Sequence, residues 1–310
     1  MRFGQRNLQS APVLFVLLAT IWGGSFVAIE VGLERLPPLL FAALRYDVAG
    51  AIVLGYAAIT RERWLPTRRS EWLSVAVDGV LLIAAFHALL YLGQGYVSGA
   101  IAAIVVSLVP LLTVLFDYSL LGDGDVDTVG GAGLAFGFVG VAVVANPTAI
   151  GFGSTALVGV TLVFLAAASF AFGSVASRPL RSRLPATAHI AWTMLAGGVV
   201  LHVASAVRGE AWAATWTPTL FAAFAYLVLA SSVFGYLLYF ELLDRVGPAE
   251  LNLVNYLVPV VAAVVSWALL GQVLGATAVT GFAVVFVGFA LLKRDTLCRL
   301  VRSRRAVPDC

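Results

Sequence analysis

The sequence is short of charged residues. Only 11% of its 310 residues are Asp, Glu, Lys or Arg, whereas a soluble domain carries about 25%. Hydrophobic residues make up 61% of the chain. One soluble core does not absorb that much apolar material, because soluble chains beyond about 250 residues divide into domains with polar surfaces. The composition therefore excludes a soluble enzyme, a disordered chain and a collagen-like fibre, and it favours a membrane protein.

Cysteine is also scarce. The two cysteines, Cys298 and Cys310, both lie in the polar C-terminal tail, so they form neither a disulfide framework nor a metal-binding spacing. Basic residues exceed acidic ones by only three, and no stretch interleaves basic and aromatic residues, which argues against a nucleic-acid partner. Walker A, H-E-x-x-H and G-x-S-x-G motifs are absent as well. We therefore expect no catalytic residues, no metal and no cofactor.

Ten apolar segments follow one another between polar breaks. A membrane-spanning helix needs about 20 mostly apolar residues, and a barrel strand is much shorter. The segments therefore predict an all-α polytopic membrane protein with ten transmembrane helices. They cover approximately residues 11–31, 38–60, 72–92, 98–120, 128–145, 156–176, 187–207, 219–240, 248–270 and 274–292. A secretory signal over the first segment is the less favoured interpretation, because no A-x-A-like cleavage site follows it.

The distribution of basic residues predicts the orientation. If the N-terminus is cytoplasmic, sixteen Arg and Lys residues lie on the cytoplasmic side, and only Arg35 and Arg208 lie on the other. Cytoplasmic loops carry such an excess of basic residues. We therefore expect both termini in the cytoplasm and a multi-pass location in the cytoplasmic (inner) membrane of a prokaryote, in contact with membrane lipid.

The chain also repeats itself. Val109-Pro110 matches Val258-Pro259 at an offset of 149 residues, and Phe138-Val139-Gly140 matches Phe286-Val287-Gly288 at an offset of 148. Each copy holds five predicted spans, an odd number, so the two repeats are expected to be inverted in the membrane. Inverted repeats place a binding site near the midplane between the halves, which is typical of transporters. The expected units are a cytoplasmic segment 1–10, repeats 11–145 and 156–292 joined by a linker 146–155, and a basic cytoplasmic tail 293–310.

Several short motifs resemble the EamA-type domain of the drug/metabolite transporter superfamily. Trp22-Gly-Gly-Ser-Phe26, Leu36-Pro-Pro38 and Leu44-Arg-Tyr46 are similar to its first copy, and Val258-Pro259 with Leu270-Gly271 to the end of its second. The resemblance covers about residues 11–292. It implies ten helices, cytoplasmic termini and transport through a central cavity. The family usually has Glu after the Leu-Gly of each copy, whereas this sequence has Asp123 and Gln272.

Ionisable residues inside a membrane are costly, so each is a functional candidate. Arg45 lies about 12 Å below the outer edge of the second span, at 1.5 Å per residue. Glu30 lies at nearly the same depth on the first span, so a Glu30–Arg45 pair is predicted, either as a substrate anchor or as a structural pin of the first hairpin. Asp47 follows Arg45 by two positions and therefore faces another way.

His87 and Tyr91 are four residues apart on the third span and share a face. The histidine could carry protons or bind substrate, or it could be a hydrogen-bonded packing residue. Asp78 lies nearer the cytoplasmic end and is an alternative proton carrier. Asp117 and Glu241 lie at span ends, where we expect them to reach the interface.

The second copy offers a more polar set. The offset of 148 places Thr193 at the position of Arg45, with Trp192 beside it. In the ninth span Asn252 and Tyr256 are expected to share a face, although the asparagines could instead hold helices together. The substrate-binding candidates are Arg45, Tyr46, His87, Tyr91, Trp192, Thr193, Asn252, Asn255 and Tyr256, and the ion-coupling candidates are Glu30, Asp47 and His87. Aromatic residues that could line a cavity are Trp22, Tyr46, Tyr91, Trp192, Tyr236 and Tyr239.

These features favour a secondary active transporter that moves a small organic metabolite or drug by alternating access, with export and proton or exchange coupling as the expected mode. Small residues, Gly133, Gly137 and Gly140 with Gly281 and Gly288, provide faces for close packing, either within one protomer or across a homodimer. The alternative functions are a membrane-embedded enzyme and a lipid-head-group flippase accessory. A receptor or scaffold is a third, and it would usually carry a sizeable extramembrane domain.

Overall fold

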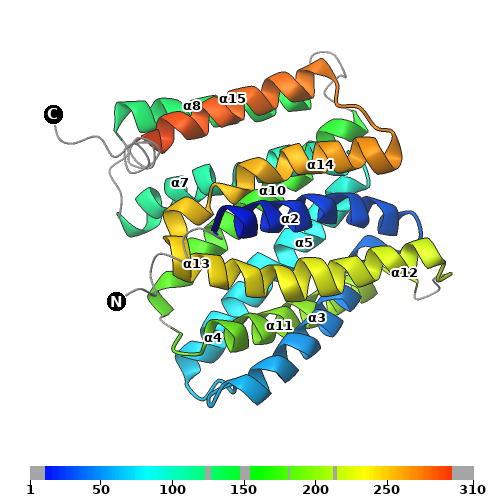
Figure 1. Cartoon of the computed structure of the whole chain (residues 1–310), viewed down its shortest axis with the longest axis vertical. Helices are drawn as coiled ribbons and strands as arrows, with labels where there is room; N and C mark the ends of the chain where they lie inside the picture. The colour runs from blue at the N-terminus through cyan, green and yellow to red at the C-terminus, as the bar shows by residue number, and fades with distance from the viewer. Residues whose placement is uncertain (1–10, 123–126, 147–153, 181, 212–214, 295–310) are drawn as a thin grey trace.

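A computed structural model of the protein describes residues 11–122, 127–146, 154–180, 182–211 and 215–294, and all regular elements in these ranges are helices (Figure 1). The first copy contains α2 (Ala11–Leu33), α3 (Pro38–Thr60), α4 (Arg69–Asp78), η1 (Gly79–Ala85), α5 (Phe86–Gln94), α6 (Gly99–Val106), α7 (Val109–Leu121) and α8 (Thr128–Ala145). The second contains α10 (Thr155–Ala176), η2 (Arg178–Leu180), α11 (Ala186–Val207), α12 (Pro218–Ala225), η3 (Tyr226–Phe234), α13 (Gly235–Leu251), α14 (Val254–Leu270) and α15 (Ala276–Leu292).

Each of the ten apolar segments corresponds to a helix or to helices joined end to end. Within the described part of the chain, eight of these are long and apolar enough to cross a membrane, and α14 and α15 are shorter apolar helices. The long helix of the ninth segment begins later than expected. α13 is kinked at Gly247, its last residues run to Leu251, and α14 starts only at Val254. At 17 residues, α14 and α15 are each about 26 Å long.

Two spans contain a π-helical segment in repeat-related positions. η1 joins α4 to α5, and η3 joins α12 to α13. Shifted by 148 residues, Gly79–Ala85 falls on 227–233, which lies inside Tyr226–Phe234. π-helical turns are rare and are frequent at functional sites. Their recurrence in both copies marks the third and eighth spans as the region in which to look for a site.

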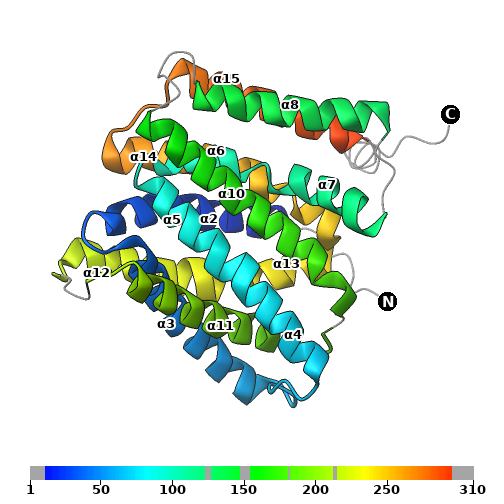
Figure 2. The same cartoon turned by 180° about the vertical axis from the view of Figure 1, so that it is seen from behind.

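Two pairs of helices at equivalent positions of the two copies pack against each other. α3 and α11 lie side by side at one end of the long axis, and α8 and α15 at the other (Figures 1 and 2). Leu40, near the start of α3, meets Glu210, just after the end of α11, whereas Gly50 lies against Leu195 further back along α11. The two helices are therefore antiparallel. The equivalent helices of the two copies run in opposite directions, as inverted repeats require.

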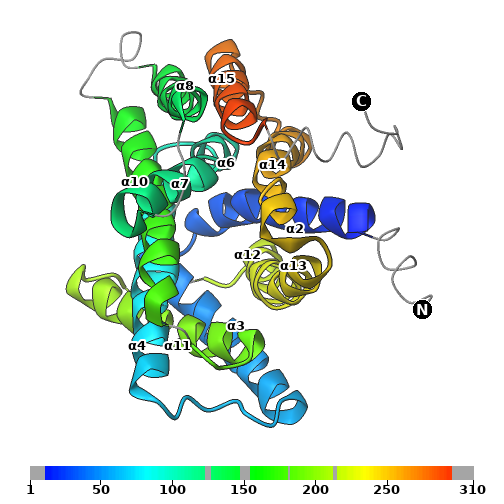
Figure 3. The same ribbon diagram turned by 90° about the vertical axis from the view of Figure 1, so that its left-hand side faces the viewer.

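The remaining helices form two walls between these pairs. α10 with α4 and α5 lies on one side, and α2 with α13 and α14 lies on the other (Figure 3). The third and eighth spans, with their π-helical segments, therefore belong to opposite walls. A side chain that points inward from α3 can reach both.

Glycines allow α8 and α15 to approach closely. A Cβ atom added to Gly133 would lie 2.5 Å from the carbonyl oxygen of Gly288, and one added to Gly140 would lie 2.7 Å from that of Gly281. Both distances are too short for a real contact, so these positions require glycine. Of the two expected uses of these glycine faces, the structure shows packing within one protomer.

The N-terminus of α3 is bound by a carboxylate from the second copy. Glu210 accepts hydrogen bonds from the backbone N–H groups of Leu39 (3.3 Å) and Leu40 (2.8 Å) and from the Ser205 hydroxyl (2.9 Å). Its side chain is 6% exposed, and Arg208 lies 3.8 Å away. The first N–H groups of a helix have no partner within the helix and carry partial positive charge, so they bind an anion well. This contact defines what we call the Glu210 end of the molecule.

We expect Glu210→Gln to lower the free energy of unfolding by about 1–2 kcal/mol, because the neutral amide accepts these N–H hydrogen bonds less strongly. Thermal unfolding of the purified protein in mild detergent measures the effect as a lower Tm. Glu34→Gln is the matched control, because Glu34 is an exposed acid in the connection between α2 and α3, close to the same helix N-terminus. An equal Tm for the two variants would contradict the assigned role of Glu210.

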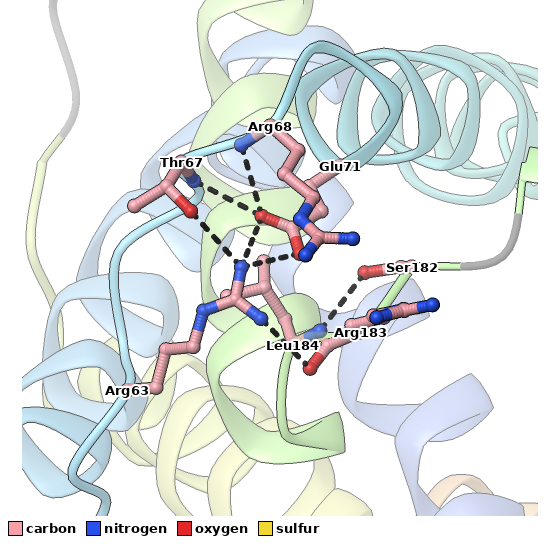
Figure 4. Close-up of polar contacts among 7 residues, drawn as sticks. All are labelled: Arg63, Thr67, Arg68, Glu71, Ser182, Arg183 and Leu184. Carbon is pink, nitrogen blue, oxygen red and sulfur yellow. Dashed lines mark hydrogen bonds and ion pairs between the residues drawn. The ribbon is translucent and has the colours of Figure 1, made fainter.

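The opposite end is held by a buried carboxylate in the first turn of α4, which binds residues of the α3–α4 connection (Figure 4). Glu71 is fully buried and accepts hydrogen bonds from Arg63 (2.5 and 2.7 Å) and from the backbone N–H groups of Thr67 (3.0 Å) and Arg68 (3.2 Å). Arg63 also donates to the carbonyl oxygen of Arg183 in the second copy, at 3.5 Å. This contact, which defines the Arg63 end, joins the two copies.

Three acidic residues at the span ends are paired. Asp117 binds Arg178 at 2.6 Å, and Glu241 binds Arg245 one turn later in α13. Asp127 caps α8 by accepting from the N–H of Gly130, and a hydrogen bond from Arg294 lowers the pKa of this exposed carboxyl.

Candidate functional site

Arg45 lies at the centre of a buried polar cluster. Its Nε donates to the Ser232 hydroxyl (2.9 Å), its Nη1 to the Tyr91 hydroxyl (3.1 Å) and its Nη2 to the Ser231 hydroxyl (3.1 Å). Only 4% of Arg45 is exposed, and its partners are buried as well. The cluster therefore brings together α3 and α5 of the first copy and η3 of the second.

His87 extends the cluster through Tyr46. The Tyr46 hydroxyl lies 2.5 Å from His87 Nε2, and His87 Nδ1 lies 2.9 Å from the carbonyl oxygen of Ile83. A carbonyl only accepts, so Nδ1 carries a proton and Nε2 accepts from the tyrosine when the ring is neutral. The Arg45 guanidinium carbon lies 5.0 Å from the centre of the Tyr46 ring, a cation–π contact. We call Arg45, Tyr46, His87, Tyr91, Ser231 and Ser232 the Arg45 cluster.

The π-helical segments explain why polar side chains gather here. Three carbonyl oxygens of these segments accept hydrogen bonds from side chains rather than only from the backbone. They are those of Leu81, Ile83 and Ser231, and their donors are Ser169 (2.9 Å), His87 (2.9 Å) and the indole N–H of Trp22 (3.3 Å). Inside a membrane, backbone groups freed by irregular turns need such partners. The same turns bring both Ser231 and Ser232 within reach of Arg45.

Aromatic rings border the cluster on the side of α2 and α13. The Trp22 ring lies 6.1 Å from that of Tyr236 and 5.7 Å from that of Tyr239, and the Tyr226 hydroxyl donates to the carbonyl oxygen of Ile21. Tyr239 stands at the position of Tyr91 when the copies are aligned at the offset of 148. Of the six aromatic candidates, Trp22, Tyr46, Tyr91, Tyr236 and Tyr239 therefore gather in one region, and Trp192 does not.

The predicted Glu30–Arg45 pair is wrong. Glu30 accepts hydrogen bonds from the backbone N–H of Gly99 (2.7 Å), at the start of α6, and from the side chain of Gln272 (2.6 Å). Equal depth on neighbouring helices does not determine which way a side chain points, and the free N–H groups at the start of α6 attract the carboxylate. Gln272 also accepts from the Ser266 hydroxyl at 2.9 Å. An acid at position 272 would face Glu30 with a like charge, so the departure from the family pattern suits this contact.

Two histidine–aspartate pairs connect the copies at α11. Asp47 lies 2.5 Å from His202, and Asp78 lies 2.7 Å from His189. Asp47 thus faces α11 rather than the Arg45 cluster, which confirms that Arg45 and Asp47 point in different directions. The Asp47 pair is also the more accessible one, with side chains 38% and 27% exposed, against 10% and 19% for Asp78 and His189.

Trp192 and Thr193 do not join the Arg45 cluster. The Trp192 indole donates to the carbonyl oxygen of Trp64 (2.9 Å), its ring packs edge-on against Trp72, and Thr193 is buried beside Gly79. Because α3 and α11 are antiparallel, an offset in sequence places equivalent residues at mirrored depths rather than at the same depth. Thr193, at the level of Gly79, therefore lies about 12 Å from the level of His87, because His87 is eight positions further along the chain at about 1.5 Å per position.

The three candidates around the start of α14 are likewise separate from the cluster. Asn252 is exposed in the break between α13 and α14, and Asn255 donates to its carbonyl oxygen at 3.3 Å. Tyr256 is buried and stacks on Phe289 of α15, with ring centres 3.8 Å apart. The expectation that Asn252 and Tyr256 share a helical face is wrong, because it assumed one continuous helix from residue 248.

Sequence reasoning missed Ser231 and Ser232, which bind Arg45. The available signal was a pair of adjacent hydroxyls inside the apolar eighth segment, aligned with Ile83 and Ala84 of the first copy. Serine is common in membrane helices, so its presence alone does not predict a partner. His189, His202 and Glu210 were missed for a similar reason, because each becomes informative only when its partner on another helix is known.

Among the residues that the structure describes, no group of three or more His, Cys, Asp or Glu side chains could hold a metal ion. What the Arg45 cluster provides is a fixed positive charge, several hydroxyl groups and a neighbouring aromatic surface. Such a set can bind and orient a molecule.

Comparison with known proteins places this arrangement in a family. The EamA-like transporter family matches twice, over residues 9–146 and 157–294. The chain is similar to the uncharacterized inner membrane transporter YedA of Escherichia coli (strain K12), with 33% identity over 297 residues, 91% of this chain and 92% of that protein. It is 26% identical over 281 residues to the uncharacterized transporter YvbV of Bacillus subtilis (strain 168), covering 90% of each.

A solved crystal structure has the same fold. It superposes with a TM-score of 0.66 at 20% sequence identity, covering 94% of this chain and 99% of that chain. The resemblance to two EamA-type copies, found from short motifs, is confirmed by the two family matches.

Proposed function

Because the chain belongs to the EamA-like transporter family, we propose that it is a secondary transporter that moves a small organic metabolite or drug by alternating access. The protein is a multi-pass protein of the inner membrane, as its apolar helices and its similarity to an inner membrane transporter indicate. The observation that carries the proposal is the Arg45 cluster, a buried polar site built from α3 and α5 of one copy and η3 of the other. Transporters made of inverted repeats bind substrate in such a position.

The proposed topology has ten spans and both termini in the cytoplasm. At about 26 Å, α14 and α15 fall at the short end of the range for a spanning helix. The excess of basic residues supports a cytoplasmic location for the Arg63 end. There Arg63 reaches Arg183 of the second copy, and Asp117 reaches Arg178. The Glu210 end then faces outward.

In the proposed cycle, the two ends separate alternately. Opening toward the cytoplasm requires the contact between Arg63 and Arg183 to break, and opening outward requires Glu210 to leave the N-terminus of α3. The Arg45 cluster lies between these contacts and stays buried while both are formed. The π-helical segments beside it are suitable bending points, because irregular turns interrupt the regular helical hydrogen bonds.

Counterflow in liposomes tests the proposal. The purified protein is reconstituted into vesicles loaded with an unlabelled solute, and entry of the labelled solute is followed for panels of amino acids, nucleobases, sugars, amphipathic cations and organic acids. We expect saturable accumulation of at least one class that protein-free vesicles lack. Vesicles loaded on one side only then show whether export is the preferred direction. The absence of saturable movement for every class would contradict transport.

Proton coupling gives a separate prediction. Asp47 is the best placed of the candidate carriers Glu30, Asp47 and His87, because His87 is buried and Glu30 is bound by Gly99 and Gln272, whereas the Asp47 side chain is accessible and pairs with a titratable histidine. We expect Asp47→Asn to abolish the stimulation of uptake by an imposed pH gradient, while counterflow stays within about twofold of wild type, since exchange needs no net proton movement. Glu30→Gln tests the second acid in the same two assays.

Asp117→Asn serves as the matched control, because it removes a carboxylate that is paired at a span end. If Asp47→Asn reduces both assays equally, Asp47 has a structural role at the α3–α11 interface. If it changes neither assay, exchange or the substrate gradient drives transport.

A further inference from the structure

Arg45 has no acidic partner among the residues that the structure describes. No carboxylate oxygen in the described residues lies within 4.0 Å of its guanidinium nitrogens. The acids of the surrounding spans are engaged elsewhere: Glu30 with Gly99 and Gln272, Asp47 with His202, and Asp78 with His189. Within the described part of the chain, the positive charge of Arg45 is therefore buried without a counter-charge.

The partners that Arg45 does have are neutral. The hydroxyls of Tyr91, Ser231 and Ser232 accept three of the five N–H groups that a guanidinium offers. Hydroxyls position the guanidinium, but they do not neutralise it, and a buried unpaired charge is costly in protein and membrane interiors alike. A permanently charged side chain cannot escape this cost by losing its proton. Such a group is expected to be retained where a ligand brings the missing negative charge.

We propose that the substrate is a small organic anion, a carboxylate or sulfonate on an aromatic or apolar body, bound through its acid group to Arg45. This inference rests on the proposed transport function and names its substrate class. The guanidinium matches a carboxylate or sulfonate with two parallel hydrogen bonds. The indole N–H of Trp22 donates to Ser231, which itself binds Arg45, so an aromatic surface formed by Trp22, Tyr236 and Tyr239 begins beside the anion position.

The same geometry selects against other solutes. An amino acid or an amphipathic cation presents an ammonium group, which needs a carboxylate or another acceptor with negative charge. The Arg45 cluster contains none, and its one fixed charge would repel a cation. We therefore expect anions to bind more tightly than zwitterions or cations of the same size.

Binding to the purified full chain tests the substrate class without requiring transport. Benzenesulfonate and indole-3-acetate are the anionic probes, and benzenesulfonamide and indole-3-acetamide are their neutral counterparts of nearly the same shape. Phenylalanine and trimethylphenylammonium represent zwitterions and cations. Each probe is titrated against the Tm of the protein, because a ligand that binds the folded state raises it. We expect the anions to bind at least about tenfold more tightly than the amides, as charged hydrogen bonds typically allow.

Three variants locate the effect. Arg45→Gln should remove the preference for the anion over the amide. Arg45→Lys should keep the preference with weaker binding, because lysine retains the charge but not the planar donor pair. Arg35→Gln removes an exposed arginine at the Glu210 end and should bind both probes as wild type does. If Arg45→Gln does not fold, Arg45→Lys still decides, because equal affinity for anion and amide in that variant overturns the proposal.

Other results are equally decisive. If neither anion raises the Tm of the wild type, if amide and anion act alike, or if the cation binds best, the assignment is wrong. Failure of the transport function gives a different result. If the protein binds the anions but transports no solute, the anion site is supported and the transport function is contradicted. If it transports a neutral or cationic solute and does not bind the anions, the transport function is supported and the anion site is contradicted.

Discussion

Replacing Arg45 with methionine is expected to lower counterflow at least about 100-fold. Methionine approximates the length of the arginine stem and removes the charge, so Tyr91, Ser231 and Ser232 lose their common donor. Charge-assisted hydrogen bonds contribute about 1.5–3 kcal/mol each, and about 1.4 kcal/mol corresponds to a factor of ten. Two such bonds to the transported molecule therefore account for a 100-fold loss.

Stability should change much less. Removal of a buried charge without a counter-charge is favourable, but Tyr91, Ser231 and Ser232 lose their donor, which is unfavourable, so we expect the Tm of Arg45→Met to stay close to that of wild type. Counterflow and thermal unfolding on the same preparation measure both effects, with Arg35→Met as the control for loss of an exposed arginine. If folded Arg45→Met protein retains half of the wild-type counterflow rate, the Arg45 cluster is not part of the transport site.

Gly140→Val is expected to have the largest effect on stability. A Cβ atom at Gly140 would meet the carbonyl oxygen of Gly281 and the backbone nitrogen of Val285, both at 2.7 Å, so α8 and α15 would have to move apart. These contacts are backbone atoms, which cannot turn aside as the end of a flexible side chain can. Overpacking of this kind costs about 1–3 kcal/mol. We expect a lower Tm and a reduced yield of folded protein.

Gly131→Val is the matched control for this experiment. Gly131 lies on the same helix, about two and a half turns earlier, and a Cβ atom there would have nothing within 4 Å. Helix propensity and hydrophobicity change equally in the two variants, so a difference between them reports the packing of α8 against α15. Equal Tm values would mean that these helices are not in contact as described.

Much of the architecture was predictable from hydropathy. The ten apolar segments became helices because, in a membrane, each backbone N–H and C=O must find a partner within its own segment. The boundaries failed mainly around the ninth span. The break at Gly247, with a positive φ of 79°, falls in the gap expected before residue 248, but α14 starts only at Val254. No Gly or Pro lies at residues 250–254 to signal this later start.

The candidate site was predictable only in part. Arg45, Tyr46, His87 and Tyr91 were identified because polar and aromatic groups in a first-copy apolar span are conspicuous, and spacing alone put His87 and Tyr91 on one face. The second-copy candidates Trp192, Thr193, Asn252, Asn255 and Tyr256 do not meet the Arg45 cluster. The alignment of the copies was correct in register, but antiparallel packing of equivalent helices places aligned residues at mirrored depths.

The sequence by itself determined the helices, the two copies and the short set of charges inside them, since these follow from hydropathy and from spacing along the chain. Only the tertiary structure decided the partners. Depth along a helix follows from residue number, whereas the direction of a side chain around the axis matters only relative to the neighbouring helices. Glu30 therefore turned to Gly99 and Gln272, Asp47 turned to His202, and Arg45 was left among neutral hydroxyls.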